Sequence, residues 1–253
     1  MSVTIAIANQ KGGVGKTTTA IELASSLKAA GYNVLAIDLD QQKNLTKYVS
    51  GDPYKNGVYE VLKGDIEISE AIQHITEFDL LSSSEKLSKA DKEFGEDIDV
   101  LILKDKLKKL KDIYDFIIID NNPARNVLLN MTYIASDYII IPAEAEEGSF
   151  DGIRAVFRDL EKYKSVNWSN ADVMGIILNK VEKTGMHEYG EAQIRSILQE
   201  QKSNAFIMRV RKSIAANECK TEGTSMQTGK KNSNPAKDYR DIAKEVIKRI
   251  LEE

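Results

Sequence analysis

The sequence opens on a short apolar run that leads directly into a glycine-rich segment. Residues 3–8 have the composition of a buried strand, and residues 9–18 read Asn-Gln-Lys-Gly-Gly-Val-Gly-Lys-Thr-Thr. A strand that turns through glycines into a helix directs backbone N–H groups and the positive end of the helix dipole at one point. Because such a turn suits a phosphate group, the start of the chain predicts an α/β fold that binds a phosphorylated ligand.

The glycine-rich segment departs from the usual phosphate-loop spacing. The usual pattern has a glycine five residues before Gly15, whereas position 10 is glutamine and Lys11 follows it. In that pattern Lys16 reaches the β- and γ-phosphates of a nucleotide, and the Thr17 hydroxyl holds Mg²⁺. We therefore expect ATP and Mg²⁺ as ligands, contacted by Lys11, Gly12, Gly13, Val14, Gly15, Lys16, Thr17 and Thr18.

Length and composition are those of a globular chain with a sizeable core. The 253 residues are 42% hydrophobic and 29% charged, and no linker, repeat or low-complexity tract divides them. We expect one domain over residues 1–253. Cys219 is the only cysteine, which excludes an intramolecular disulfide and is typical of a cytoplasmic protein. His74 and His187 lack metal-ligand spacing, and no stretch resembles a membrane span or a secretory signal.

Apolar strand-like runs alternate with helical patterns along the chain. This alternation predicts βαβ units and a doubly wound, mostly parallel sheet with helices on both faces. Residues 82–99 are polar and predict a loop with a short helix, and residues 221–234 predict a mobile surface loop. The expected strands are 3–8, 34–39, 78–82, 116–120, 138–141, 173–178 and 205–208, and the clearest expected helices are 17–30, 101–111 and 148–164.

The last expected helix, residues 235–251, is amphipathic. Tyr239, Ile242, Val246 and Ile250 recur at helical spacing, which fits either docking on the sheet or binding at a membrane surface. Acids balance its basic residues, and bulky aromatic anchors are missing beyond Tyr239. We therefore favour docking on the sheet.

Three aspartates stand where strands are expected to end. Asp38 and Asp40 close the second strand, and Asp120 closes the strand over residues 116–120. Because ligands of open α/β sheets bind at the carboxyl ends of strands, all three can face the phosphates. We expect Asp120 to hold Mg²⁺ together with Thr17, and Asp38 and Asp40 to polarise the attacking water or touch the metal's shell. Either of these two taken alone is more typical of a turn or a helix cap.

Asn179 also follows an expected strand. Its amide could hydrogen-bond the donor and acceptor edges of adenine, and a plain turn-forming asparagine is the equal alternative.

These segments resemble the ParA/MinD superfamily of P-loop ATPases. Lys-Gly-Gly-Val-Gly-Lys-Thr-Thr is similar to that family's deviant Walker A motif, and residues 38–42 resemble its second motif. Residues 120–123 resemble the end of its Walker B, and Ile141-Pro142 followed by Gly152 resembles a further family segment. The chain departs from the family at Gln41, where proline is common, and at residues 121–122, where two asparagines replace small residues or proline.

The resemblance implies roles for particular residues. In the family, the lysine at the place of Lys11 crosses an ATP-sandwich homodimer and contacts the nucleotide of the partner. A cation placed there acts like an arginine finger, a contact worth about 10³–10⁵ in rate. By the same resemblance Asp40 is tied to hydrolysis, so the expected catalytic residues are Lys11, Lys16 and Asp40.

Charge is distributed unevenly along the chain. The net charge is −4, yet residues 202–240 hold nine basic and three acidic side chains. A basic stretch of this kind could bind duplex DNA without reading its sequence, or it could be a solvated face or partly line the nucleotide pocket. The candidate DNA contacts are Arg209, Arg211, Lys212, Lys237 and Arg240.

Taken together, the motifs and the resemblance favour a ParA-type DNA-partition ATPase that is cytoplasmic and associated with the nucleoid. Its expected partners are a second copy of the chain, nonspecific double-stranded DNA and a centromere-binding ParB-type adaptor that stimulates hydrolysis. One alternative is a MinD-like ATPase that cycles on a membrane, which the balanced charges of the last helix disfavour. Another is a ParA-like protein that positions a protein cargo.

Overall fold

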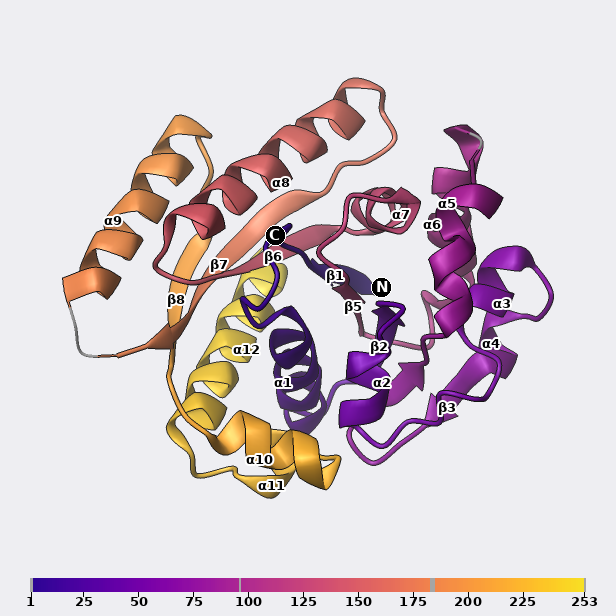
Figure 1. Ribbon diagram of the computed structural model, residues 1–253, viewed down its shortest axis with the longest axis horizontal. Coiled ribbons are helices and arrows are strands. Elements are labelled where there is room, and N and C mark those ends of the chain that lie inside the picture. Colours follow the sequence, from indigo (N-terminus) through magenta and orange to yellow (C-terminus); the bar gives the residue numbers. More distant parts are fainter. Residues whose placement is uncertain (1, 96, 183–184, 253) are drawn as a thin grey trace.

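The computed structural model describes residues 2–95, 97–182 and 185–252, and its strands form one central sheet (Figure 1). The strand order across this eight-stranded sheet is β3-β4-β2-β5-β1-β6-β7-β8. The strands are β1 (Val3–Ile7), β2 (Val34–Leu39), β3 (Ile72–His74), β4 (Asp79–Leu81), β5 (Phe116–Asn121), β6 (Tyr138–Ala143), β7 (Asp172–Val181) and β8 (Phe206–Arg211).

Parallel pairing brings the ends of the central strands to one edge. Only β3 with β4 is antiparallel among the described pairs, and β2, β5 and β1 lie side by side in parallel. The register sets Asp120 opposite Asp38 on one side and opposite Ile7 on the other. The acids that end β2 and β5 therefore lie beside the start of the glycine-rich loop, as the sequence predicts.

Helices cover both faces of the sheet, which confirms the predicted doubly wound fold. One face packs on α1 (Lys16–Ala29), α2 (Asn44–Tyr48), α10 (Ala215–Glu222), α11 (Met226–Gly229) and α12 (Asn234–Glu252). The other packs on α3 (Val58–Lys63), α4 (Ile68–Ala71), α5 (Ala90–Glu93), α6 (Ile102–Leu107), α7 (Val127–Ala135), α8 (Glu147–Ser165) and α9 (Gly185–Glu200). Because the central strands are buried on both sides, they read as nearly continuous apolar runs.

Several element boundaries differ from those expected from the sequence. The short edge strand β3 was not expected, because three residues are too few to show an alternating pattern. The helix expected over 101–111 is divided into the 3₁₀ turn Asp97–Leu101, α6 and the 3₁₀ turn Lys108–Leu110. Within 82–99, where residue 96 lies outside the described part, the expected loop with a short helix contains the 3₁₀ turn Glu85–Lys89 and α5.

Helix α12 docks on the sheet beside α1. Its apolar side chains Tyr239, Ile242 and Val246 are buried, and the hydroxyl of Tyr239 shares a 2.9 Å hydrogen bond with the Thr19 hydroxyl of α1. This packing uses the apolar face that a membrane-surface helix would need, so it supports the docked interpretation. Of the helices in the described part of the chain, none has both the length and the apolar character to span a bilayer.

The segment expected to be a surface loop over 221–234 is partly buried, so that expectation is wrong. Two buried acids, Glu22 and Glu77, hold residues Ser225–Thr228 of this segment by hydrogen bonds. We call these two acids and these four residues the acid clasp. The backbone N–H of Met226 donates to Glu22 Oε1 at 2.7 Å, and that of Ser225 donates to Glu77 Oε1 at 3.1 Å. The local composition could not reveal this clasp, because both acids come from distant segments.

Burial makes the clasp sensitive to pH. It raises the pKa of Glu22 to about 7 from an ordinary value of 4.5. Because the folded pKa lies above the unfolded one, the folded state holds the proton more tightly. The resulting destabilisation is absent below pH 4.5 and is complete above about pH 7, so the free energy of unfolding falls as pH rises through that window.

Glu22→Gln should flatten this pH dependence, because the amide stays neutral while its oxygen still accepts from Met226. Relative to the native chain, the free energy of unfolding of the variant should increase by up to about 1.4 kcal/mol for each pH unit in the window. Urea unfolding at about pH 5, 6, 7 and 8 measures the change, and Glu161→Gln at an exposed site should keep the native slope. Equal slopes for Glu22→Gln and the native chain would contradict the prediction.

Candidate nucleotide-binding site

The glycine-rich loop has a left-handed backbone at two places and open space inside. Gly13 and Gly15 adopt φ values of +79° and +95°, which side chains rarely tolerate. A Cβ atom placed on Gly12 or Gly13 would meet no atom of the described residues within 4 Å. A Cβ atom on Gly15 would lie 2.7 Å from Asn179 Nδ2. The loop therefore has room for phosphate oxygens at its tip and is tightly packed at its base.

Lys16 is buried between the loop and the acidic strand ends. Its ammonium group donates a 2.9 Å hydrogen bond to the carbonyl oxygen of Lys11, and Lys16 as a whole is 7% exposed. Burial lowers the pKa of Lys16, and the negative charges of Asp120 and Asp40 oppose that effect. The sequence-predicted lysine and both acids thus interact electrostatically.

Asp120 is the least satisfied polar side chain at this edge. It is fully buried, and neither carboxylate oxygen has a hydrogen-bond partner in the described part of the chain. Burial raises its pKa well above the ordinary range, the charge of Asp38 adds to the rise, and the nearby Thr17 hydroxyl and Lys16 oppose it. A buried carboxylate without partners is costly unless a cation accompanies it. Oxygen atoms of a carboxylate and a hydroxyl suit Mg²⁺, so Asp120 and Thr17 fit the expected metal.

Asp38 and Asp40 differ in how much of their acceptor capacity is used. Asp38 is fully buried and accepts hydrogen bonds from Asp40 N at 3.1 Å, Thr46 N at 2.9 Å and Thr46 Oγ1 at 2.7 Å. Burial raises the pKa of Asp38 to about 6. Asp40 accepts from Gln42 N at 3.0 Å and keeps acceptor capacity. Asp38 therefore holds the turn into α2 through its hydrogen bonds.

Lys11 folds back onto its own chain. Its ammonium group forms an ion pair with Glu146 at the start of α8, and its backbone N–H donates to Asn9 Oδ1 at 2.9 Å. Asn9 is itself held, because its amide donates to the carbonyl oxygen of Pro142 at 2.8 Å. The sequence did not indicate Glu146, because the pairing joins two loops that are far apart in the chain.

Two neighbouring residues at the end of β7 hold the glycine-rich loop. The amide of Asn179 donates to the carbonyl oxygen of Val14 at 2.7 Å, so the loop occupies the group expected to contact a base. Contact with a base remains a prediction. Lys180, which sequence reasoning missed, donates to the carbonyl oxygen of Gly13 at 3.2 Å and pairs with Glu144 at 2.6 Å. Its place directly after Asn179 at a strand end was the available signal.

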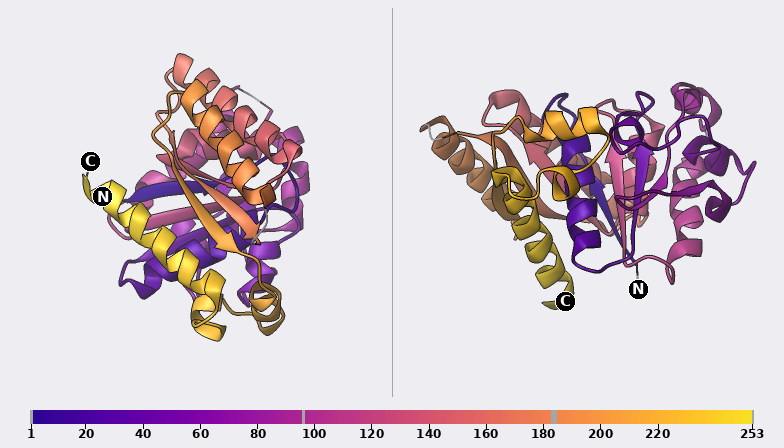
Figure 2. Two further views of the ribbon diagram at one scale, coloured as in Figure 1. Left: turned by 90° about the vertical axis from the view of Figure 1, so that its left-hand side faces the viewer. Right: turned by 90° about the horizontal axis from the view of Figure 1, so that it is seen from below.

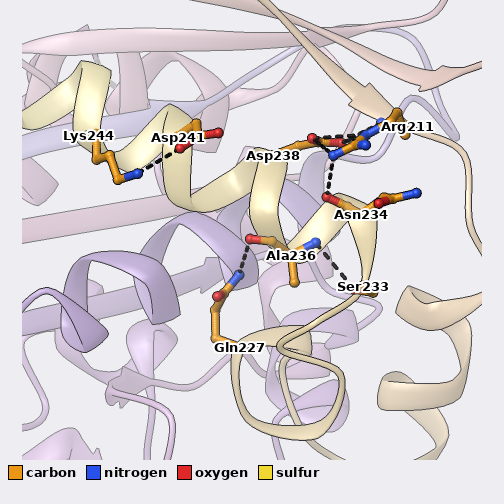
Figure 3. A network of polar contacts seen from close by, with 8 residues as sticks. All are labelled: Arg211, Gln227, Ser233, Asn234, Ala236, Asp238, Asp241 and Lys244. Atoms are coloured by element: carbon orange, nitrogen blue, oxygen red, sulfur yellow. Dashed lines mark hydrogen bonds and ion pairs between the residues drawn. The ribbon is translucent and has the colours of Figure 1, made fainter.

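Acidic side chains already engage several of the predicted DNA-contacting residues. Figure 3 shows Arg211 bound to Asp238, with Nε to Oδ2 at 2.9 Å, while its Nη2 donates to the carbonyl oxygen of Asn234 at 3.2 Å. In the same network the Gln227 amide donates to the carbonyl oxygen of Ala236 at 3.0 Å. Arg211 therefore ties the end of β8 to the start of α12.

The remaining basic candidates differ in exposure and pairing. Arg209 pairs with Glu191 and Lys212 with Glu182, and both acids lie outside the 202–240 stretch. These pairs reduce the local positive surplus read from the sequence. Arg240 donates to Gln227 Oε1 and to the carbonyl oxygen of Lys231, both at 2.9 Å. Lys237 is exposed and forms no ion pair with the residues that the structure describes.

Gly15→Ala should destabilise the loop, because alanine would need a left-handed backbone and its Cβ would collide with the Asn179 amide. The left-handed conformation alone costs about 1–2 kcal/mol. Chemical unfolding without ligand measures this loss, and the variant should also bind ATP more weakly. Gly12→Ala is the matched control, since its Cβ meets open space, and its free energy of unfolding should change by less than about 0.5 kcal/mol. Equal free energies of unfolding for Gly15→Ala and Gly12→Ala would refute the packing argument.

Comparison with known proteins identifies relatives over most of the chain. The family model described as "AAA domain" matches residues 2–174. An uncharacterized protein of Methanocaldococcus jannaschii is 38% identical over 192 residues, which are 72% of this chain and 74% of that protein. The chromosome-partitioning ATPase Soj of Thermus thermophilus is 30% identical over 250 residues, which are 98% of this chain and 96% of that protein.

A solved structure with the same fold holds a nucleotide and a metal. It is cobyrinic acid a,c-diamide synthase from Mycobacterium smegmatis with bound ADP and magnesium, at a TM-score of 0.80 and 26% identity. The match covers 99% of this chain and 96% of that one. With its strand–loop–helix phosphate site and these relatives, the chain belongs to the AAA-domain family whose model it matches, and thereby to the ParA/MinD superfamily of P-loop ATPases.

Proposed function

We propose that the chain, as one ATPase unit over residues 1–253, hydrolyses ATP with Mg²⁺ and partitions DNA. The observation that carries the ATPase proposal is Asp120, which lies buried beside Lys16 and Thr17 and has no hydrogen-bond partner among the described residues. The partition role is supported by whole-length similarity to a chromosome-partitioning ATPase. We propose that the working cycle joins an ATP-bound dimer, nonspecific binding to nucleoid DNA in the cytoplasm, and release when a centromere-binding ParB-type partner stimulates hydrolysis.

Each residue of the site has a task in this proposal. Lys16 and the loop N–H groups bind and orient the phosphates, and Asp40 positions the attacking water. Thr17 and Asp120 would hold Mg²⁺, which when bound offsets the charge that the phosphates carry. Because Asp38 holds the turn into α2 through Thr46, it acts on Asp40 by fixing its backbone.

A dimer requires Lys11 to change partners. In the described chain it pairs with Glu146, whose side chain is 47% exposed, while that of Lys11 is 28% exposed. A pair this open to solvent contributes little stability, about 0–1 kcal/mol. We infer that Lys11 readily leaves Glu146 for the γ-phosphate of a nucleotide in a second copy. ATP would then strengthen dimerisation, and dimerisation would strengthen ATP binding by the same factor.

The proposed DNA contact rests on basic residues of the C-terminal segment. Lys237 is exposed and Arg240 is half-buried. Such residues would bind phosphates of duplex DNA regardless of base sequence. The membrane-cycling alternative is weaker, since the apolar face of α12 packs on β8 and α1. A protein that positions a protein cargo in place of DNA would use the same ATP site. Measuring binding to duplex DNA distinguishes the two functions.

Lys11→Ala should prevent ATP-dependent dimerisation while leaving the fold intact. The variant loses the cation that is proposed to reach the partner's nucleotide, while the ion pair lost with it is open to solvent and the backbone hydrogen bond to Asn9 remains. Sedimentation with a nonhydrolysable ATP analogue would show native dimers and variant monomers, with Lys28→Ala, at an exposed position of α1, behaving as native. Dimers of native stability in Lys11→Ala would refute the role in the second copy.

Asp40→Ala should slow turnover while ATP still binds. Loss of a group that positions water lowers the rate by about 10²–10⁴, and the phosphate contacts of Lys16 and the loop remain. Phosphate release measures turnover, and calorimetry measures binding of the ATP analogue. The exposed Asp112→Ala is the control for loss of a negative charge. Undiminished hydrolysis by Asp40→Ala would remove Asp40 from the mechanism.

Random-sequence duplex DNA should bind in the presence of ATP and much less with ADP, and its affinity should fall steeply as salt rises. Lys237→Ala should weaken binding and reduce the salt slope by about one ion per contact. Lys248→Ala, an exposed lysine near the C-terminus, should change neither. Anionic vesicles are the competing surface, and ATP-dependent binding to vesicles alone would overturn the DNA proposal.

A further inference from the structure

Lys220 on α10 is a half-buried cation. It has no role in the nucleotide site proposed around the phosphate loop. Its ammonium group lies 5.0 Å from the centre of the Tyr48 ring on α2. It forms no ion pair with the acids in the described part of the chain. A cation over an aromatic ring regains only part of the hydration that it loses on burial. Lys220 therefore has no direct ion-pair partner within the described chain.

Helix α10 holds this lysine at the edge of the sheet that carries the phosphate loop. The right-hand view of Figure 2 shows α10 and α11 at that edge, in front of α1, with both chain ends at the opposite edge. The Ser50 hydroxyl donates to the carbonyl oxygen of Gly223 at 3.2 Å, which ties the end of α10 to the segment after α2. The acid clasp fixes the next segment of the chain, through Glu22 of α1.

Helix α10, which carries Lys220, lies at the same edge of the sheet as the nucleotide site, and charged groups of that site act on Lys220. Burial lowers the pKa of Lys220, the negative charges of Glu22 and Asp120 oppose that shift, and the positive charge of Lys180 adds to it. Asp120 is the proposed metal ligand, and Lys180 donates to the loop carbonyl of Gly13. A side chain that both groups influence lies within the field of any phosphate that the loop binds.

We propose that Lys220 is a further nucleotide-binding residue, whose ammonium group contacts the phosphates of ATP or ADP from the α10 side of the site. The anionic ligand supplies a direct ion-pair partner, which Lys220 lacks in the described chain. This proposal rests on the ATP site proposed above. Its consequence is that nucleotide binding orders α10, and through the acid clasp the segment that leads to α12.

The first test measures nucleotide affinity by calorimetry, with ADP and with a nonhydrolysable ATP analogue. Lys220→Gln should raise the Kd for both ligands about tenfold, as expected for loss of a charge-assisted hydrogen bond. Lys220→Arg should keep the affinity within about threefold, because it keeps the charge. Lys230→Gln is the matched control in the same segment, where the lysine pairs with Glu218 at 3.2 Å, and it should bind as the native chain does.

A second readout does not depend on a variant. Hydrogen exchange of the native chain should slow over residues 213–229 when the ATP analogue binds. A Kd of Lys220→Gln equal to that of the native chain, or unchanged exchange over 213–229, would overturn the role of Lys220 and leave the ATP site standing. A native chain that binds neither nucleotide would overturn the proposed function as well.

Discussion

Burial of a carboxylate that has no hydrogen-bond partner in the described chain is the constraint on which this architecture depends. Asp120 ends a central strand, and parallel pairing on both sides holds it between Asp38 and the start of the phosphate loop. Leaving such a group unpaired costs several kcal/mol, which other contacts must offset when no cation is bound. Lys16 and Thr17 lie close enough to moderate that cost. The site thus contains a negative charge, that of Asp120, which the metal of a metal–nucleotide complex would balance.

The sequence predicts well those features that the parallel sheet dictates. A glycine-rich turn after β1 and aspartates at the ends of β2 and β5 must meet at one edge, whatever the loops do. The features that it could not predict depend on contacts between distant segments. The backbone of Thr46 donates a hydrogen bond to Asp38. Glu22 and Glu77 accept hydrogen bonds from a segment that the sequence presents as a surface loop, and they hold part of it in the interior. Position and composition carry no signal for such pairings.

The basic stretch shows the same limit in its electrostatics. Counting charges over 202–240 predicts a strongly positive surface, but Glu182 and Glu191 reach in from the segments before and within α9. The relatives show a parallel limit for function, since a chromosome-partitioning ATPase and a cobyrinic acid a,c-diamide synthase are both similar to nearly the whole chain. A shared fold and phosphate loop therefore establish the ATPase superfamily, while the proposed DNA contact depends on surface residues such as Lys237.

The central claim is that Asp120 and the phosphate loop together form a metal–nucleotide site. Calorimetric titration with ATP, in the presence of Mg²⁺ and after its removal with a chelator, tests it directly in the native chain and in Asp120→Asn. We predict that Mg²⁺ strengthens ATP binding to the native chain by about tenfold or more and has little effect on Asp120→Asn. Equal Mg²⁺ dependence in both proteins, or no binding of ATP by the native chain, would contradict the account.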